Sequence, residues 1–329
     1  MKSKSLLSIT GVLSMATVML PGAGCQPLDA ATSVTRDTKA PGIWVIQNDK
    51  VQVTVDAPRG RIMHYGFRDG SNALWTNFQA EESQYMIGSW VNWGGDKIWP
   101  WPQDIFGGWP PPEVSYEVRA NDKGDGLVMT SAVNPAIRAR IVRTIELDND
   151  SSSMIVTSWF EPTETNFGRP MAAWSITQVP PPDALYARIA LAGDRNRYIN
   201  RGGVGNDTFQ ARQVGQRMVK LATPDTVAKT FLDADVIAAV YPDYILLQRQ
   251  IPVQTQGVWT ADQRAQIYSH GLSSTNVPRG KSYYELEWTA PILPPNQVRN
   301  APLRVVYKLV KLNKNTTPEQ IVELIDKLP

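Results

Sequence analysis

The sequence is poor in the residues that build disulfides and transition-metal sites. Its 329 residues include one cysteine and two histidines. One thiol cannot form an internal disulfide, so a disulfide scaffold and a multi-cysteine zinc domain are both excluded. An excess of either charge is also lacking, because 33 Lys and Arg against 31 Asp and Glu leave a formal net charge of +2. The sequence therefore predicts no nucleic-acid partner and no cofactor. A calcium site needs no tight sequence signature, so that question stays open.

Tryptophan and proline are abundant, with 11 and 25 copies. Hydrophobic residues make up 42% of the chain and charged residues 19%, which supplies a sizeable core and excludes wholesale disorder. The chain has no internal repeat, and no shift in composition divides it. We therefore predict one large domain over residues 41–329.

The first 24 residues have the pattern of an export signal, with a basic start and an apolar run over residues 6–20. The run is too short and too rich in Ser and Thr for a membrane span. Small residues at positions 21–24 precede Cys25, and this junction resembles a bacterial lipoprotein signal in which the cysteine is lipidated. Gly22 departs from that pattern, which normally has an aliphatic residue there. Cleavage followed by simple secretion is therefore the competing interpretation.

These features predict where the mature protein is located. We expect an exported lipoprotein anchored to a membrane through Cys25, on the periplasmic side or at the cell surface; the alternative is a periplasmic or secreted protein. Gln26 follows the cysteine, and the absence of Asp there resembles lipoproteins that are sent on to an outer membrane. Residues 25–40 are polar and lack apolar periodicity, which predicts a flexible tether with a reach of roughly 20 Å.

Apolar and polar residues alternate through most of the chain from Gly42 onward, as in residues 51–55, which is the pattern of half-buried β-strands. Turns rich in Gly, Asn and Asp separate these runs. One helix is expected near the C-terminus. There Thr317 can cap it, Pro318 suits its first position and Gln320 completes a capping box. The predicted fold class is all-β, with a short C-terminal helix.

Six of the eleven tryptophans lie within 35 residues. The segment 90–103 among them is too rich in Gly and Pro to predict a regular strand or helix, so we expect a long ordered loop. Indole faces stack on the C–H faces of sugar rings and polar neighbours bind hydroxyl groups, so the segment predicts a carbohydrate site. The competing interpretation is a small aromatic core under the loop. The predicted sugar contacts in this segment are Asn92, Trp93, Asp96, Lys97, Trp99 and Gln103.

A series of short motifs occurs in an order that resembles the galactose mutarotase superfamily. The motifs are Arg59-Gly60-Arg61-Ile62, Gly94-Gly95-Asp96-Lys97-Ile98-Trp99-Pro100, Arg143-Thr144-Ile145-Glu146-Leu147, Trp174-Ser175-Ile176-Thr177-Gln178, Tyr283-Tyr284-Glu285-Leu286-Glu287 and Leu293-Pro294-Pro295. Each is weak alone, and their order over residues 44–312 carries the resemblance. The chain is more similar still to a bacterial domain-of-unknown-function family allied to that superfamily. The resemblance implies a β-supersandwich with a concave carbohydrate-binding face.

The resemblance also implies a chemistry. Mutarotases open and reclose an aldose ring with a Glu base and a His acid on opposite sides of the sugar. Alternation along residues 283–289 puts Glu285 and Glu287 on one strand face, in the region where the family has its base. The family's mid-chain His has no counterpart, because residues 171–178 contain none. His270 is then the candidate acid, although a lone histidine is more often structural.

Three further residues are predicted to contact the sugar. Trp174 and Gln178 lie in the mid-chain motif, and Arg140 is one of three nearby arginines that could supply positive charge. Two functions from different classes follow. The first is an aldose 1-epimerase-like isomerase with Glu285 or Glu287 as base, and the second is a non-catalytic surface carbohydrate-binding lipoprotein that has lost the acid. A merely solvated strand face is the third interpretation of the two glutamates.

Overall fold

The structure is a computed structural model whose regular elements are almost all β-strands. It describes residues 32–78, 86–87, 90–103, 114–163, 170–189, 209–252, 264–271, 282–294, 296–298 and 301–327. The predicted export signal and Cys25 lie outside these residues, as do Trp109 and Trp259. The described residues form 21 strands and one helix, which confirms the all-β prediction with a short C-terminal helix.

Nine antiparallel strands form one sheet. In spatial order they are β1 (Ser33–Arg36), β2 (Ile43–Gln47), β3 (Val51–Asp56), β4 (Arg61–Phe67), β7 (Asp96–Trp101), β12 (Ala172–Val179), β20 (Tyr284–Thr289), β19 (Ala265–His270) and β16 (Val227–Leu232). Strands from the beginning, middle and end of the chain therefore lie side by side. The central strands β7, β12, β20 and β19 are paired along most of their lengths, which makes them a rigid support.

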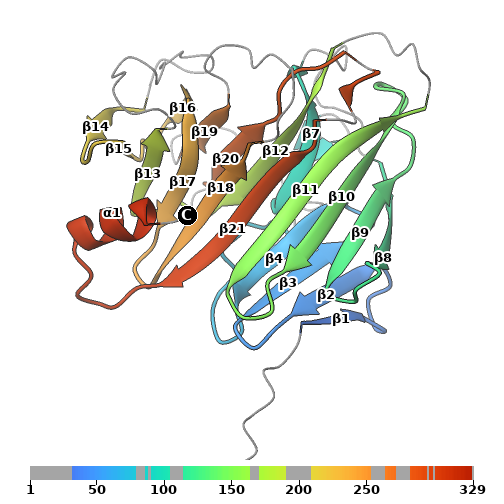
Figure 1. Ribbon diagram of the computed structural model, residues 1–329, viewed down its shortest axis with the longest axis horizontal. Coiled ribbons are helices and arrows are strands. Elements are labelled where there is room, and N and C mark those ends of the chain that lie inside the picture. Colours follow the sequence, from blue (N-terminus) through green and yellow to red (C-terminus); the bar gives the residue numbers. More distant parts are fainter. Residues whose placement is uncertain are drawn as a thin grey trace, which may run out of the picture.

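Ten antiparallel strands form the second sheet. In spatial order they are β14 (Ala211–Gln213), β15 (Met218–Leu221), β13 (Ala184–Ile189), β17 (Ala234–Val240), β18 (Tyr244–Ile251), β21 (Leu303–Lys311), β11 (Ser153–Pro162), β10 (Ala139–Leu147), β9 (Gly126–Ser131) and β8 (Tyr116–Ala120). The strands β5 (Met86–Ile87) and β6 (Trp90–Val91) form a separate two-stranded sheet. Figure 1 shows β21, β11, β10 and β9 in the front layer, with the blue strands β2 to β4 behind them.

The main hydrophobic core fills the space between the two large sheets. Successive side chains on a strand point to opposite faces, so one set from each strand reaches this core. Val51, Val53 and Val55 of β3 are fully buried in it, and so are Leu286 and Trp288 of β20. Each such side chain contributes roughly 1.5–3 kcal/mol on burial. The core therefore fixes which face of each strand remains for a binding site.

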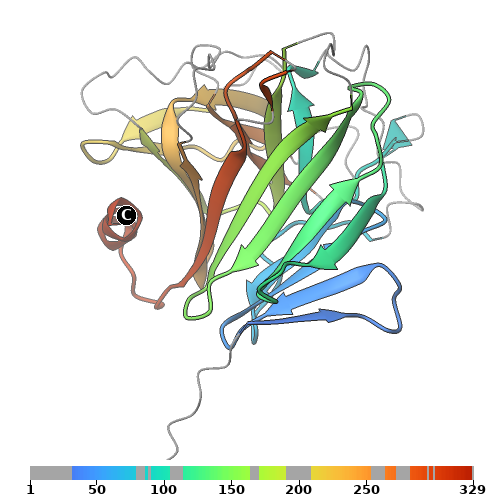
Figure 2. The same cartoon turned by 45° about the vertical axis from the view of Figure 1, so that its right-hand side comes forward.

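The helix α1 (Pro318–Asp326) covers an apolar patch on the far side of the ten-stranded sheet. The Gln320 backbone N–H donates to the Thr317 hydroxyl oxygen, and the Thr317 N–H donates to the Gln320 side chain, which is the predicted capping box. Ile321 and Ile325 pack against outward-facing residues of β13, β17 and β18. In Figure 2 the helix is seen nearly end on, beside this sheet.

The C-terminal end of α1 is tied to the sheet by Arg188 of β13. Its guanidinium donates to the backbone carbonyl of Asp326 at 3.0 Å and forms an ion pair with Asp235 at 3.0 Å. A cation at this end of a helix meets the unpaired carbonyls and the negative end of the helix dipole. The same side chain thus joins β13, β17 and the last turn of α1.

The structure begins its regular pairing earlier than the sequence analysis expected. Residues 33–36 form β1 and pair with residues 44–47 of β2, and the Thr32 N–H donates to the Asn149 side chain at 3.2 Å. The flexible tether predicted over residues 25–40 is therefore wrong for this part. The strand forms because Ser, Val and Thr suit an edge strand that can pair with an existing sheet.

The tryptophan-rich segment also contains a strand where we expected a loop. β7 occupies its middle and pairs with β12 from Asp96 to Trp101. In the described part of the sheet, β4 pairs with β7 at one residue pair only, Ile62 with Asp96, so most of that edge of β7 has no partner strand. Pro100 is tolerated in such a place because its missing N–H leaves no partner unsatisfied.

Candidate functional site

The predicted catalytic glutamates lie on the face of the nine-stranded sheet that points away from the main core, here called the outer face. Glu285 of β20 lies between Gln178 of β12 and Tyr268 of β19 in the strand register. Glu287 lies one step along, beside Gln266 of β19. Directly opposed residues on one sheet face have Cβ atoms about 4.5–5.5 Å apart. The register therefore brings side chains from three separate parts of the chain together.

Glu287 is fully buried and held by an ion pair. Lys229 of β16 places its Nζ 2.9 Å from both carboxylate oxygens, and the Trp174 indole N–H donates to Oε2 at 2.8 Å. Burial raises the pKa of Glu287, while the Lys229 charge and the Trp174 hydrogen bond act in the opposite direction. Because its oxygens are engaged and none of its surface reaches solvent, Glu287 is not placed to take a proton from a substrate.

Glu285 differs from Glu287 because it is half-buried and has no cation partner among the described residues. Its Oε1 accepts a hydrogen bond from the Gln178 side-chain amide at 2.7 Å. This leaves Oε2 available on a face that solvent can reach. Of the two predicted bases, Glu285 is therefore the one positioned to contact a ligand.

A row of aromatic rings borders Glu285 on the outer face. The His270 ring stacks on Tyr283 with centroids 4.8 Å apart, and Tyr283 packs against Trp75 at 4.7 Å. The Tyr268 hydroxyl lies 2.7 Å from His270 Nδ1. Burial lowers the pKa of His270, with Glu285 acting in the opposite direction, and burial raises the pKa of Tyr268. At pH 7 the imidazole is therefore neutral, and which group donates in the Tyr268–His270 hydrogen bond depends on the tautomer of the ring.

Two buried glutamines on this face have polar atoms without partners. Gln178 Oε1 accepts no hydrogen bond, and both amide atoms of Gln266 are unpaired, although each side chain is fully buried. Unpaired buried polar groups are costly and uncommon, and they occur where water, an ion or a ligand normally completes the bonding. These atoms therefore mark a place next to the glutamates where water, an ion or a ligand can complete the hydrogen bonding.

The predicted tryptophan platform is packed into the protein. Trp174 is 3% exposed and Trp99 7% exposed, and their rings meet edge to face at 5.9 Å. Trp101 packs on Trp174 in the same cluster, and Lys97, which is also buried, lies over the Trp99 ring at 3.7 Å. This arrangement favours the small aromatic core over a stacking surface for these residues. Among the described tryptophans, Trp75 is the one that continues the row of rings beside Glu285.

Asp96 faces the main core and not the outer face, so the predicted sugar contact at this residue is wrong. Its carboxylate forms an ion pair with Arg143 and accepts hydrogen bonds from Tyr307 at 2.7 Å and Thr177 at 2.6 Å. Both members of the ion pair are fully buried. The strand parity explains the difference, because Asp96 and Lys97 are neighbours on β7 and point to opposite faces.

Arg140 is also far from the outer face, which corrects its predicted role. It lies on β10 of the ten-stranded sheet and is exposed, while Ile141 and Arg143 point into the main core.

Trp93 is nearly buried against Met63. Two further predicted contacts are placed without an evident ligand role: Asn92 is buried and receives a hydrogen bond from the Gly94 N–H, and Gln103 is half-buried just after β7.

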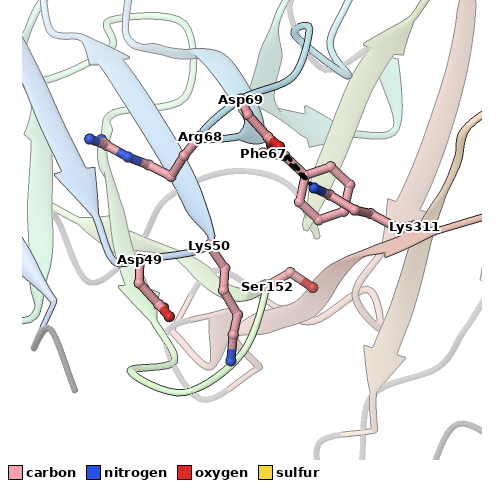
Figure 3. Close-up of a pocket in the computed structure, with 7 residues that line it drawn as sticks. All are labelled: Asp49, Lys50, Phe67, Arg68, Asp69, Ser152 and Lys311. Atoms are coloured by element: carbon pink, nitrogen blue, oxygen red, sulfur yellow. Dashed lines mark hydrogen bonds and ion pairs between the residues drawn. The ribbon is translucent and has the colours of Figure 1, made fainter. Parts of the chain in front are cut away.

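A hollow of about 490 Å³ lies at the end of the sandwich, away from the predicted residues. Figure 3 shows Lys311 and Asp69 pointing toward one another across it, with Phe67 behind them. The Lys50 amine donates to the Asp150 carbonyl, and Arg68 donates to Gln52 at 3.2 Å. One ion pair, between Lys311 and Asp69, thus lies at this hollow, and none of the predicted site residues lines it.

Five residues of the site were not predicted from the sequence: Trp75, Tyr283, Lys229, Gln266 and Tyr268. The last two lie on β19 with His270, and alternation along Gln266-Ile-Tyr-Ser-His270 puts all three on one face. That signal was present in the sequence. Nothing in the sequence showed that β16 pairs with β19, so Lys229 could not be placed beside Glu287.

Solved structures with the same architecture allow the fold to be compared. A galactose mutarotase-like protein from Lactobacillus casei aligns with 82% of this chain and 100% of its own, at 12% sequence identity and a TM-score of 0.51. A protein from Salmonella typhimurium described as a candidate mutarotase covers 86% of this chain and 94% of its own, at 10% identity and a TM-score of 0.51. The fold is galactose mutarotase-like. No protein-family model matches the sequence, and the comparison with curated proteins finds no match.

The mutarotase-like fold agrees with the resemblance found in the sequence motifs, and at these identities it establishes the fold alone. Within the described ranges, no cluster of three or more His, Cys, Asp or Glu side chains could hold a metal ion. The one helix in those ranges is too short to cross a membrane. Function must therefore be argued from the outer face itself.

Proposed function

We propose that the protein binds a carbohydrate on the outer face, at Glu285 and Gln178. The observation that carries this proposal is the group of unpaired polar atoms on Gln178 and Gln266 beside a half-buried carboxylate. Sugar hydroxyls both donate and accept, so they can satisfy an amide oxygen and an amide N–H at once. The adjacent rings of Trp75 and His270 supply apolar surface for a sugar ring.

The ion pair with Lys229 makes Glu287 unsuitable as the general base of a mutarotation reaction. A general base must present an accessible lone pair near the proton that it removes. Both oxygens of Glu287 instead accept from Lys229, and residues 171–178 contain no histidine to serve as the acid that the family has in this region. These two observations are consistent with a binding protein that keeps the fold and has lost the catalytic acid and base.

Titration of the protein with neutral and charged monosaccharides, followed by NMR chemical shifts or calorimetry, tests the binding proposal. We expect saturable binding that weakens in Glu285→Gln and in Gln178→Met. Trp159 lies on the ten-stranded sheet and donates to Glu161, so Trp159→Phe is a matched control that should bind as the wild type does. Absence of binding across the whole panel would overturn the proposal.

A second candidate function is aldose epimerisation with Glu285 as base and His270 as acid. Its support is that His270, which is hydrogen-bonded to Tyr268 through Nδ1, lies on the strand next to Glu285 and on the same sheet face. Anomer exchange measured by NMR decides between the two functions. Exchange above buffer that disappears in Glu285→Gln and persists in Glu287→Gln would favour the enzyme, whereas exchange at the buffer rate would leave binding alone.

We also propose that the mature protein is an exported lipoprotein attached to a membrane through Cys25. The basic start, apolar run and small residues before this cysteine support the proposal. Metabolic labelling with a fatty acid, followed by cell fractionation, tests it. Label and membrane association should both be lost in Cys25→Ser. Label-free protein in the soluble fraction of wild-type cells would favour simple secretion.

A further inference from the structure

The two glutamates of β20 differ in how their charge is balanced. Glu287 shares Lys229 through two contacts of 2.9 Å, whereas Glu285 has a neutral amide as its hydrogen-bond partner. Both face the same way, and Glu285 is already half-buried. A ligand that covers Glu285 removes more water from its charge, which is costly unless the ligand supplies compensating donors.

Gln178 adds a second acceptor for which a ligand would have to supply a donor. Its Nε2 donates to Glu285 Oε1, and the reverse amide orientation would bring two oxygens together, so the orientation is fixed. Gln178 Oε1 then remains as a fully buried acceptor with no partner. Glu285 and Gln178 are therefore register neighbours that each keep an acceptor oxygen, and the one donor group of this pair, the Gln178 amide, already donates to Glu285.

The neighbouring rings add no positive charge to this pair. His270 is neutral at pH 7 because burial lowers its pKa, and its Nδ1 is engaged by Tyr268. Tyr283 and Trp75 continue the row of rings, whose faces carry partial negative charge and attract cations. Among the described side chains no ion pair neutralises Glu285, because Lys229 is paired with Glu287.

We infer that the carbohydrate bound here carries a protonated amine, as in a 2-amino-2-deoxyhexose, and that this ammonium group sits between Glu285 and Gln178. The inference rests on the proposed carbohydrate binding and names its substrate class. An ammonium group has three donors and no acceptor, which matches two acceptors and leaves one N–H for water. An N-acetyl group at the same position has one donor and no charge, so it matches this pair poorly.

The experiment compares sugars that differ only at the amine. Glucosamine and galactosamine are titrated against glucose, galactose and N-acetylglucosamine by calorimetry, with ethanolamine as a simple amine. We expect the amino sugars to bind about tenfold or more tightly than the neutral sugars, because hydrogen bonds to charged groups are the strong ones. Ethanolamine should bind much more weakly than glucosamine, since it lacks the ring.

Glu285→Gln keeps the size of the side chain and removes its charge, so it should abolish the preference for amino sugars. Gln178→Met removes the second acceptor and should weaken glucosamine binding several-fold while keeping some preference. Glu117 on β8 is exposed, so Glu117→Gln makes the same change of net charge away from the site and should leave the preference intact. Thermal unfolding confirms that each variant is folded.

The outcomes separate the two proposals. Equal affinity for amino and neutral sugars would overturn the amino-sugar inference and leave carbohydrate binding in place. A preference that survives in Glu285→Gln would also overturn it. Failure of every sugar to bind, with or without ethanolamine binding, would overturn both proposals.

Discussion

Two buried charge clusters on opposite faces of the same sheet have similar parts and different surroundings. Inside the sandwich, Asp96 is paired with Arg143 and receives hydrogen bonds from Thr177 and Tyr307. On the outer face, Glu287 is paired with Lys229 and receives a hydrogen bond from the Trp174 indole. Each cluster therefore holds one buried carboxylate with one cation and at least one neutral donor.

The difference lies in the polar atoms next to each cluster. Around Asp96, Gln248 donates to Thr177 at 2.8 Å and accepts from the Trp288 indole at 2.8 Å, so the network closes on itself. Around Glu287, the amide of Gln266 has no partner at either end. A closed network indicates a structural role, and an open one leaves polar atoms that water, an ion or a ligand can complete.

The largest expected effect comes from breaking the closed cluster. Arg143→Met leaves the Asp96 charge buried without its cation and should lower the free energy of unfolding by about 3–5 kcal/mol. Urea denaturation at neutral pH measures this. The double variant Asp96→Asn with Arg143→Met should lose less than the two single losses added together, because the isolated charge is removed. Additive losses would contradict the closed-network interpretation.

Breaking the outer pair should cost less. Lys229→Met should lower the free energy of unfolding by about 2 kcal/mol at neutral pH, because the Lys229 side chain is 14% exposed and Trp174 still supports Glu287. Burial raises the pKa of Glu287 in the folded protein above its ordinary value of 4.5. The contribution of Glu287 to the free energy of unfolding is therefore fully present below pH 4.5 and is lost as the pH rises through the folded-state pKa.

Removing the Lys229 cation raises the folded-state pKa of Glu287 further and widens the pH range between its unfolded-state and folded-state pKa values. The loss caused by Lys229→Met should therefore be smaller at acidic pH than at neutral pH, and denaturation at several pH values measures the difference. The double variant Lys229→Met with Glu287→Gln has no buried charge and should remove this additional pH dependence. A loss that is independent of pH would show that packing, and not charge, explains the effect.

The open network should allow a gain in stability. Gln266→Leu replaces two unpaired buried polar atoms with apolar surface and should raise the free energy of unfolding by about 1 kcal/mol, while sugar binding weakens. Gln250 is a matched control, since it donates to the Thr289 carbonyl at 2.9 Å and accepts from Arg264 at 2.7 Å. Gln250→Leu should destabilise the protein by about 1–3 kcal/mol. Destabilisation in both variants would refute the open-network interpretation.

The smallest expected effect on folding belongs to Glu285. Glu285→Gln should change the free energy of unfolding by less than about 0.5 kcal/mol, because the side chain is half-buried and its one hydrogen bond can be kept by the new amide. Thermal unfolding gives the stability, and the sugar titrations give the affinity for the same preparation. An affinity loss without a stability loss would separate the site residue from the structural one.

Sequence periodicity predicted strands such as β3 and the shared face of Glu285 and Glu287, because alternation is a local property of one strand. It could not place Lys229 beside Glu287, since that contact depends on pairing between β16 and β19, which are separated along the chain. Parity also decided two corrections. Asp96 points into the main core and Lys97 to the outer face, while Arg143 points into the core and Arg140 to solvent. Composition alone does not distinguish these positions.

The tryptophans show a second limit of the sequence. A cluster of Trp residues indicates aromatic surface, but the exposed fraction depends on which elements pack over it. Trp99 and Trp174 meet each other and become core, whereas Trp75 packs on Tyr283 at the border of the candidate site. The order of the family motifs identified the fold, and the partners of each motif residue had to come from the structure.

The Arg188 contact at the end of α1 has a practical consequence for the sugar titrations. The helix is fastened to the outward side of the ten-stranded sheet, and the candidate site lies on the outward side of the other sheet. A chain immobilised on a sensor chip through its C-terminus would therefore present Glu285 toward the flowing solution. Surface-based assays can thus use a C-terminal attachment without covering the residues that they are meant to probe.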